Sequence, residues 1–282
     1  MKTRQGGAKS KGSRMKYRLL CADLDGTLLT SRKTVSERTR SVLVRKQEEG
    51  LVIALASGRT VQGIMPSAGE LRLESFGGYA LAFNGGRIVE CATGRTVRSA
   101  CIPDGAAAEL FRLARSRGCD LVTYAGDDVV TSGMDNPWAR YEARCNGLSM
   151  RESADFTEFA GVPLNKCLMA GPPETISLLA GEASAAFGAD MEFYRSEPFF
   201  LECVPRGVDK GSSLAFLAGL LGIPAAGTIA FGDGYNDISM LRRAGLGVAM
   251  ANAREDVRSA AEYVAASNDE DGLALAAELF CV

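Results

Sequence analysis

Short apolar runs of strand length, separated by helix-like segments, constrain the fold of this chain more than any other feature. Residues 51–56 (LVIALA) are continuously apolar, and residues 18–22, 79–83, 228–231 and 247–250 are similar runs. Continuous runs of this kind are typical of strands buried on both faces, as in parallel sheets. Because helical spacing of apolar residues alternates with these strands, the sequence predicts a doubly wound α/β sheet, the Rossmann-like architecture.

The middle of the chain has a different order, in which helix-like segments are followed by neighbouring strands. This order predicts an antiparallel α+β module inserted between the two halves of the α/β domain. We place the α/β domain at residues 15–86 and 206–282 and the inserted module at residues 87–205. Residues 1–14 hold five basic residues and no acidic one, and we expect a disordered tail there. Within the module we expect helices at residues 104–117 and 173–187 and strands at residues 121–124, 129–131, 164–170, 191–194 and 199–204.

Histidine is absent from all 282 residues. Its absence excludes Ser-His-Asp hydrolases, Cys-His proteases and zinc sites with histidine ligands. Catalysis in this chain must therefore use carboxylates, lysine, hydroxyls, thiols or a metal held by oxygen. The formal charge is −2, which is unlike the strongly basic face of a nucleic-acid-binding protein. No apolar run approaches the roughly 18 residues of a membrane span, so we expect neither nucleic acid nor membrane as a partner.

The eight cysteines are spread singly along the chain, and none forms a C-x-x-C pair. Several lie inside apolar runs, as Cys21 and Cys167 do. Single cysteines in such runs are typical of buried thiols in a reducing compartment. We therefore expect a cytoplasmic protein.

An acidic cluster follows the first predicted strand, at the end of the sheet where open α/β folds bind ligands. Its sequence is Asp23-Leu24-Asp25-Gly26-Thr27. Residues two apart in an extended segment point the same way, so both carboxylates can face one centre. They suit a hard cation, or a division of labour between a nucleophile and a general acid/base. The alternative is an Asp-rich turn, which the position directly after a buried strand disfavours.

Two further clusters are weak when each is taken alone. Ser57-Gly58-Arg59 follows the second strand, where a hydroxyl and backbone N–H groups can cradle a phosphate, although most such triplets are plain turns. Lys210 follows Asp209, a candidate N-cap, in the first turn of a predicted helix. The helix dipole disfavours a cation there. Lys210 therefore indicates either a nearby anion, such as a phosphoryl group, or an exposed lysine at a helix start.

A second acidic cluster follows the strand at residues 228–231. Asp233 and Asp237 are four residues apart and share a face if a helix begins between them. With Asp23 and Asp25 they form a pocket of oxygen donors, which like-charge repulsion destabilises unless a cation binds. Mg²⁺ fits such a pocket because it prefers a few carboxylates together with water and substrate phosphate.

In this order the four clusters resemble the haloacid dehalogenase superfamily of phosphohydrolases, and their details resemble its Cof-type subgroup with a large inserted (C2-type) cap. The resemblance runs from about Tyr17 to the C-terminus and is strongest at residues 231–241 (FGDGYNDISML), 247–250 and 252–253. Asn84-Gly85-Gly86 resembles the turn at which that subgroup enters its cap. The cap itself matches only in pattern and length.

The resemblance implies a Mg²⁺-dependent phosphatase that hydrolyses a small phosphorylated metabolite, such as a sugar phosphate or a phosphorylated cofactor, through an aspartyl-phosphate. It implies that Asp23 is the nucleophile and Asp25 the general acid/base. The implied metal site comprises Asp23, the backbone carbonyl of Asp25, Asp233 and Asp237, the last binding directly or through water. The implied phosphate- and substrate-binding residues are Thr27, Ser57, Gly58, Asn84, Lys210 and Asn236, of which Asn236 either contacts the phosphate or holds Lys210.

Two other functions remain as alternatives. A phosphomutase of the same superfamily would need anchors for a second phosphate, and Arg140, Arg144 and Arg195 are candidates, although each is more often a solvated surface residue. A non-catalytic metabolite-binding protein on the same fold is disfavoured because the acids and Lys210 are all present. A dinucleotide-binding protein is disfavoured because no G-x-G-x-x-G follows the first strand.

Overall fold

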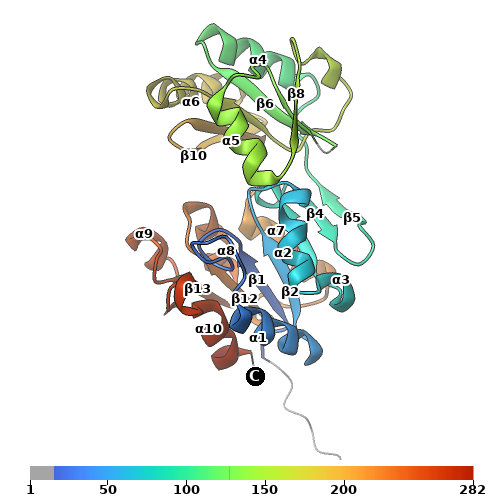
Figure 1. Ribbon diagram of the computed structural model, residues 1–282, viewed down its shortest axis with the longest axis vertical. Coiled ribbons are helices and arrows are strands. Elements are labelled where there is room, and N and C mark those ends of the chain that lie inside the picture. Colours follow the sequence, from blue (N-terminus) through green and yellow to red (C-terminus); the bar gives the residue numbers. More distant parts are fainter. Residues whose placement is uncertain (1–15, 127, 282) are drawn as a thin grey trace, which may run out of the picture.

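The computed structural model describes residues 16–126 and 128–281, and these residues form two β-sheets with helices packed against them (Figure 1). The first sheet has eight strands in the order β14-β13-β12-β1-β2-β3-β4-β5. Its strands are β1 (Leu19–Asp23), β2 (Val52–Ala56), β3 (Tyr79–Ala82), β4 (Arg87–Glu90), β5 (Thr96–Ser99), β12 (Thr228–Gly232), β13 (Leu246–Met250) and β14 (Tyr263–Ala265). The expected tail at residues 1–14 lies outside the described residues.

The six strands from β14 to β3 run parallel to one another, and β4 and β5 add an antiparallel pair at one edge. Every residue of β1 and β12 is buried, because helices cover both faces. This agrees with the continuous apolar runs in the sequence. The predicted doubly wound α/β fold is therefore confirmed, with strand boundaries within one or two residues of those expected.

The helices of the first sheet divide between its faces. On one face α1 (Glu37–Glu48), α2 (Val61–Glu70), α3 (Leu73–Phe76) and α10 (Gly272–Phe280) pack against Leu20 and Ala22 of β1. On the other face α7 (Lys210–Leu220), α8 (Ile238–Arg243) and α9 (Glu255–Arg258) pack against Leu19 and Cys21. Because successive side chains of a strand point to opposite faces, a single strand supplies both apolar layers. We refer to this sheet with its helices as the first-sheet unit.

The second sheet has six strands in the order β10-β11-β9-β6-β7-β8 and forms, with its helices, the second-sheet unit. Its strands are β6 (Asp120–Ala125), β7 (Asp128–Thr131), β8 (Ser149–Glu152), β9 (Cys167–Ala170), β10 (Met191–Glu197) and β11 (Phe200–Pro205). Its helices α4 (Ala106–Ser116) and α6 (Pro173–Phe187) share one apolar core, and α5 (Pro137–Asn146) packs on the other face. The predicted α+β composition is confirmed, but the sheet is mixed, because β7 and β8 pair in parallel.

The boundary between the units differs from the one we expected at residue 86. β4 and β5 belong to the first sheet, where Ile88 is fully buried, although the inserted module was placed at residues 87–205. The chain therefore passes to the second-sheet unit after β5 and returns after β11. Hydrogen bonding accounts for the difference, because the chain reverses after Ala82 and β4 pairs directly back onto β3.

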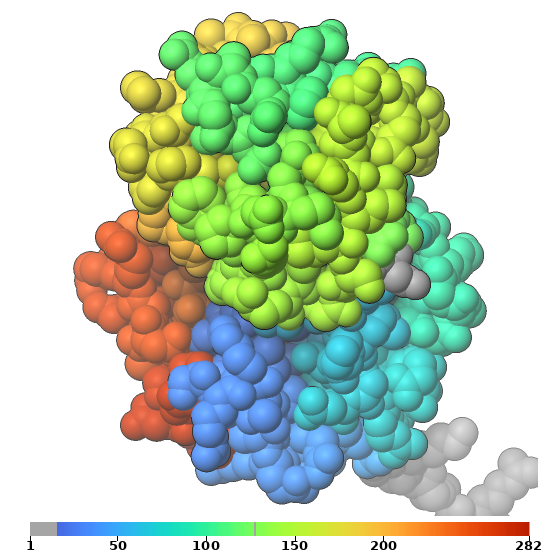
Figure 2. Space-filling view, turned by 45° about the horizontal axis from the view of Figure 1, so that its top comes forward, coloured from blue at the N-terminus to red at the C-terminus, as the bar shows by residue number. Residues whose placement is uncertain are grey.

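The second-sheet unit lies over the carboxyl ends of the parallel strands, and α5 reaches down toward α2 (Figure 1). In the space-filling view the green segment around α5 rests directly on the blue N-terminal segments (Figure 2). Asn146 of α5 accepts a hydrogen bond from the backbone N–H of Thr60, the N-cap of α2, at 2.9 Å. Among the helices of the described residues, none is long and apolar enough to cross a membrane.

Candidate active site

Three neighbouring strands bring the predicted site residues to one edge of the first sheet. β1 lies between β12 and β2, so Asp23, Ser57 and Asp233, which end or follow these strands, meet beneath the second-sheet unit. The adjacent order of these strands, far apart in the sequence, is what assembles the acids from the two halves of the chain.

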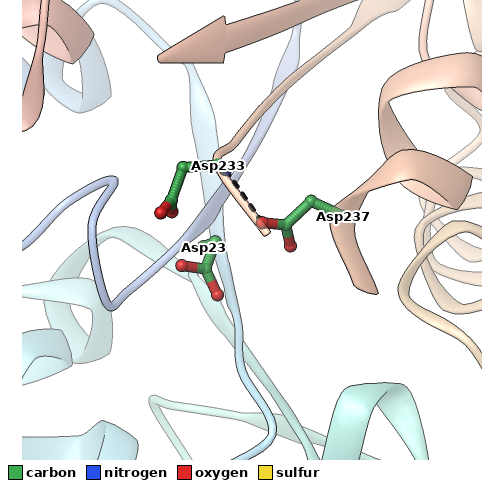
Figure 3. A group of neighbouring side chains, drawn as sticks. All are labelled: Asp23, Asp233 and Asp237. Atoms are coloured by element: carbon green, nitrogen blue, oxygen red, sulfur yellow. Dashed lines mark hydrogen bonds between the residues drawn. The ribbon is translucent and has the colours of Figure 1, made fainter. Parts of the chain in front are cut away.

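Asp23, Asp233 and Asp237 form a compact acidic cluster (Figure 3). Each offers a carboxylate oxygen, and these oxygens lie within 4.8 Å of one another. Asp237 is fully buried, and its Oδ2 accepts hydrogen bonds from the backbone N–H groups of Asp233 and Gly234 at 3.0 and 2.8 Å. A short 3-10 turn at Tyr235–Asp237 folds the chain back so that these bonds can form.

Lys210 lies against this cluster as a fully buried cation. Its Nζ is 2.5 Å from Oδ1 of Asp23 and 2.6 Å from Oδ1 of Asp237. Asp209 is the N-cap of α7, as predicted, and accepts a hydrogen bond from the backbone N–H of Ser212 at 2.7 Å. The attraction of the two carboxylates outweighs the unfavourable helix dipole at this position. Of the two interpretations, Lys210 is therefore the lysine paired with an anion and not the exposed one.

Burial and mutual repulsion set the protonation of this cluster. Burial raises the pKa of Asp23 well above its ordinary value, and Lys210 offsets only part of this effect. Burial, assisted by the charge of Asp237, raises the pKa of Asp233 to about 6. Burial alone would lower the pKa of Lys210, but Asp23 and Asp237 outweigh it and keep the ammonium charged. Two buried acids and one partly buried acid beside a single cation leave an excess of acidic groups over basic ones.

The donor set fits a hard divalent cation. All three acids offer oxygen, and the group contains neither thiolate nor imidazole. Oxygen-only sites with several carboxylates favour Mg²⁺, Ca²⁺ or Mn²⁺ over soft transition metals. A cation between Asp23 and Asp233 would relieve the repulsion that raises the pKa values of both carboxyl groups.

Asp25 lines the same cavity as this cluster but is held by two cations of its own. Its carboxylate accepts two hydrogen bonds from Arg59, at 2.7 and 2.9 Å, and one from Lys33 at 2.7 Å. Burial by itself raises the pKa of Asp25, but these hydrogen bonds and charges outweigh it and hold the pKa below its ordinary value. Among the described residues, the Asp25 carboxylate is not part of the metal-like cluster. Only its backbone carbonyl is then left for the metal contact that the resemblance implies.

Thr27 and Gly26 shape the position of Asp233. The Thr27 hydroxyl donates to Oδ1 of Asp233 at 2.7 Å, and its expected contact with phosphate stays a prediction. Gly26 has a φ of +86°, and a Cβ at this position would lie 2.3 Å from Oδ2 of Asp233. Only glycine allows the loop after β1 to approach the second acid so closely.

The turn after β2 and the turn after β3 pack against each other. Ser57 is buried, and its hydroxyl accepts a hydrogen bond from the backbone N–H of Arg59 at 3.2 Å. The Ser57 carbonyl accepts one from the backbone N–H of Asn84, which has a φ of +54°. The Gly58 carbonyl accepts one from Lys166 of the second-sheet unit at 3.1 Å.

Asn84 connects three segments of the chain. Its Nδ2 donates to the hydroxyl of Tyr194 at 2.7 Å, and its Oδ1 accepts from Nδ2 of Asn236 at 3.0 Å. Asn236 binds Asn84 and does not hold Lys210, which Asp23 and Asp237 hold instead. The contact of Asn236 with phosphate stays a prediction. Tyr194 belongs to β10, so this network ties the second-sheet unit to the site.

Two adjoining cavities of about 510 and 580 Å³ lie between the units. The first is lined by Asp23, Asp25 and Asp233 from below and by Lys166 and Glu202 from above. The second reaches Lys210 and Tyr194. The residues that line both cavities are Gly58, Ser196, Glu202, Gly234 and Asn236. This space is large enough for a small-molecule ligand beside the acidic cluster.

Sequence reasoning missed several residues of the site, although a signal existed for some. Arg59 stands in the Ser57-Gly58-Arg59 triplet but received no role. Glu202 is a single acid within an apolar strand, and Lys166 directly precedes another such strand. Burying a single charge within or beside a strand costs free energy unless the charge is paired. A charged residue at such a position can therefore indicate a site. Lys33 and Tyr194 gave no such signal.

Comparison with known proteins identifies the family. The family of haloacid dehalogenase-like hydrolases matches residues 20–276. The chain belongs to this family. A haloacid dehalogenase-like hydrolase from Bacteroides thetaiotaomicron has a crystal structure that matches with a TM-score of 0.89 and 41% identity, over 94% of this chain and 99% of that one. The resemblance to the haloacid dehalogenase superfamily that the sequence motifs indicated is confirmed.

Curated relatives of this haloacid dehalogenase-like hydrolase carry phosphatase names. A Haemophilus influenzae protein with a provisional phosphatase name is 32% identical over 265 residues, which are 94% of this chain and 98% of that protein. The 5-amino-6-(5-phospho-D-ribitylamino)uracil phosphatase YcsE of Bacillus subtilis is 25% identical over 264 residues, which are 92% of this chain and 94% of that protein. The similarity therefore extends over both units.

Proposed function

We propose that this hydrolase is a Mg²⁺-dependent phosphatase that releases inorganic phosphate from a small phosphorylated metabolite. The observation that carries the proposal is the largely buried group of Asp23, Asp233 and Asp237 with Lys210 bonded between two of them. An excess of buried negative charge next to a cavity is what a divalent cation and a phosphoryl group together would require. The phosphatase names of the relatives support the same reaction.

Asp23 is the proposed nucleophile, because the other two acids are already engaged. Asp233 accepts a hydrogen bond from Thr27, and Asp237 accepts three, from Lys210 and two backbone N–H groups. Among the described residues, only Lys210 is hydrogen-bonded to the Asp23 carboxylate, through Oδ1. An Asp23 oxygen would attack phosphorus and form an aspartyl-phosphate while the bond to the leaving-group oxygen breaks. Lys210 would stabilise the charge on the transferring group.

The metal would be held by the carboxylates of Asp23 and Asp233 and by the backbone carbonyl of Asp25, with Asp237 orienting this shell. When bound, Mg²⁺ supplies Lewis-acid polarisation of the phosphoryl oxygens and neutralises charge. Thr27 would fix the Asp233 carboxylate through its 2.7 Å hydrogen bond, as outer-shell partners of metal ligands commonly do. Ser57 and Lys210 would bind phosphoryl oxygens in the same pocket.

Asp25 is the proposed general acid/base. In the present arrangement Arg59 and Lys33 hold it as a carboxylate. This is the form that takes a proton from water when water cleaves the aspartyl-phosphate. To protonate the leaving oxygen in the first step, Asp25 must first take up a proton from solvent, which requires that one of these cations moves away. A phosphoryl group entering the cavity offers Arg59 a competing anion, which would release Asp25 for that role.

The second-sheet unit is proposed to act as a cap that excludes water and contacts the leaving group. Three hydrogen bonds join the units around the site, from Thr60 to Asn146, from Asn84 to Tyr194 and from Lys166 to Gly58. We accordingly divide the chain into a catalytic core built on the first sheet and a cap built on the second. Water exclusion strengthens every electrostatic interaction within the site.

The test is phosphate release from p-nitrophenyl phosphate by the Asp23→Asn variant. We expect turnover to be abolished, because the amide cannot form the acyl phosphate. Asp135→Asn is the matched control, since Asp135 is fully exposed and pairs only with Arg140 among the described residues. Chelation by EDTA should stop turnover of the parent enzyme, and added Mg²⁺ should restore it. Retained activity in Asp23→Asn, or metal-independent turnover, contradicts the proposal.

A phosphomutase is the second candidate, and the arginines expected to anchor a second phosphate bear on it. Arg140 is paired with Asp135 at 2.6 Å and does not line either cavity. Arg144 lines the first cavity and Arg195 the second. Transfer of phosphate between positions of a hexose phosphate without net phosphate release would favour the mutase over the phosphatase.

A further inference from the structure

We infer that Glu202 and Lys166 form a leaving-group subsite that selects phosphate esters with neighbouring hydroxyl groups. The inference rests on the proposed phosphatase function and adds two specificity-determining residues to it. Neither residue takes part in the cluster that would bind the phosphoryl group, since both lie in the second-sheet unit.

The two residues form a buried ion pair in the wall of the first cavity, and Glu202 also lines the second. Glu202 lies in the middle of β11, and Lys166 directly precedes the adjacent strand β9. Their side chains are only 6% and 2% exposed, and Oε2 of Glu202 is 3.1 Å from Nζ of Lys166. Lys166 also donates to the Gly58 carbonyl at 3.1 Å and lies over the ring of Tyr124. Lys166 thereby holds the pair against the proposed phosphate-binding turn.

Glu202 has hydrogen-bonding capacity that the protein does not fill, because each carboxylate oxygen can accept two hydrogen bonds. Although Oε2 is close to Lys166, it has no hydrogen-bond partner of acceptable geometry among the described residues. Burial raises the pKa of Glu202 against the opposing charge of Lys166. A buried carboxylate that is ion-paired but only partly hydrogen-bonded is costly, and native proteins usually complete the hydrogen bonds of such a group. Glu202 lines both cavities, so a bound molecule can supply the missing donor.

The chemistry of the pair specifies the kind of donor. A carboxylate accepts hydrogen bonds, and an ammonium group donates them. Two such groups about 3 Å apart match two adjacent hydroxyls, one of which donates to Glu202 while the other accepts from Lys166. A second phosphate is disfavoured at the pair itself, because the Glu202 carboxylate would repel it. An apolar leaving group would bury Oε2 without any donor.

The experiment compares hexitol phosphates with hexyl phosphate, which has the same carbon number and a primary phosphate ester but no free hydroxyl. For each enzyme we take the ratio of kcat/KM for the best hexitol phosphate to kcat/KM for hexyl phosphate. We expect a large ratio for the parent enzyme, since sites that hydrogen-bond a hydroxyl reject analogues without it. Glu202→Gln should lower this ratio about tenfold or more, because the charged acceptor is lost.

Glu202→Asp provides a second variant, which keeps the charge beside Lys166 but withdraws the carboxylate from the cavities. It should lower the ratio as well, and it is the decisive variant if Glu202→Gln fails to fold. Glu174→Gln is the matched control, because Glu174 is exposed in the first turn of α6 and should leave the ratio unchanged.

The outcomes separate this inference from the proposed function. A parent enzyme that hydrolyses hexyl phosphate as well as every hexitol phosphate overturns the subsite. So does an unchanged ratio in both Glu202 variants, or an equal loss with both substrates, which would indicate a structural role only. If the parent enzyme releases phosphate from no ester, including p-nitrophenyl phosphate, then the proposed phosphatase function itself fails.

Discussion

Removal of the buried cation should destabilise the metal-free protein by several kcal/mol. Lys210→Met leaves Asp23 and Asp237 without the ammonium that now lies 2.5 and 2.6 Å from them. The lysine side chain is fully buried, and the two carboxylates are 10% and 1% exposed, so water cannot replace the lost charge. Breaking a buried ion pair by removing one partner costs about 3–5 kcal/mol. We expect a loss of this size at neutral to alkaline pH.

The loss should depend on pH with a definite sign. Burial already raises the folded-state pKa of Asp23, and removing Lys210 raises it further. A carboxyl group with a raised folded-state pKa favours the folded protein at acidic pH, and this contribution disappears as the pH rises through that pKa. The destabilisation of Lys210→Met should therefore be greatest at alkaline pH and shrink as acid protonates Asp23.

The assay is urea unfolding in EDTA, followed by far-ultraviolet circular dichroism over a range of pH. Lys33→Met is the matched control, because it also removes a lysine bonded to a carboxylate, that of Asp25. This pair is 63% and 37% exposed, so its loss should cost at most about 1 kcal/mol. If the two variants lose the same free energy of unfolding at alkaline pH, the electrostatic account of the Lys210 cluster is refuted.

Further predictions concern the neighbours of the cluster. Thr27→Val removes the hydroxyl that bonds Asp233, and Mg²⁺ affinity measured by calorimetry should fall about tenfold; unaltered affinity would rule out this supporting role. Gly26→Ala places a Cβ 2.3 Å from Asp233 at a φ of +86°, which would displace this carboxylate. Mg²⁺-dependent phosphate release should therefore fall about tenfold or more. A fully active variant would show that the loop shifts to make room for the added methyl group. Burial raises the pKa of Asp233 to about 6, so protons compete with Mg²⁺ for this carboxylate below that pH. The rise in Tm on adding Mg²⁺ should therefore be smaller at acidic than at alkaline pH. A rise in Tm that does not depend on pH would contradict this. Arg59→Met removes two hydrogen bonds from Asp25 and should raise the pKa of this carboxyl group. The acidic limb of the pH–rate profile should then move to higher pH. If the limb does not move, Asp25 is not the catalytic base.

Elements with strong apolar patterns were predictable, and elements without them were not. The strand at residues 51–56 corresponds to β2, and the helix at residues 173–187 coincides with α6. α5 was missed, because its buried positions are mainly Ala139, Ala143 and Asn146, which leave little hydrophobic period. β8 was missed because none of its four residues is buried, which leaves no apolar pattern. Its pairing with β7 at the edge of the sheet holds it in place.

The site divides in the same way. Asp23 and Asp233 could be placed together from sequence, because the carboxyl ends of parallel strands meet at one edge of a sheet. Lys210 begins a helix, and only the family resemblance placed it beside them. The partners of Asp25 could not, since Lys33 and Arg59 reach it through loop conformations that no local pattern encodes.

The order of residues along the chain determined the alternating layers, the acids at the strand ends and an oxygen-only chemistry without histidine. These follow from local periodicity and from residue type, which act over a few positions. Tertiary structure alone decided that Glu202 and Lys166, 36 positions apart, line the same cavity as Asp23. The proximity of these three residues depends on which strands pair and on how one sheet lies over the other. Both are properties of the whole packed chain.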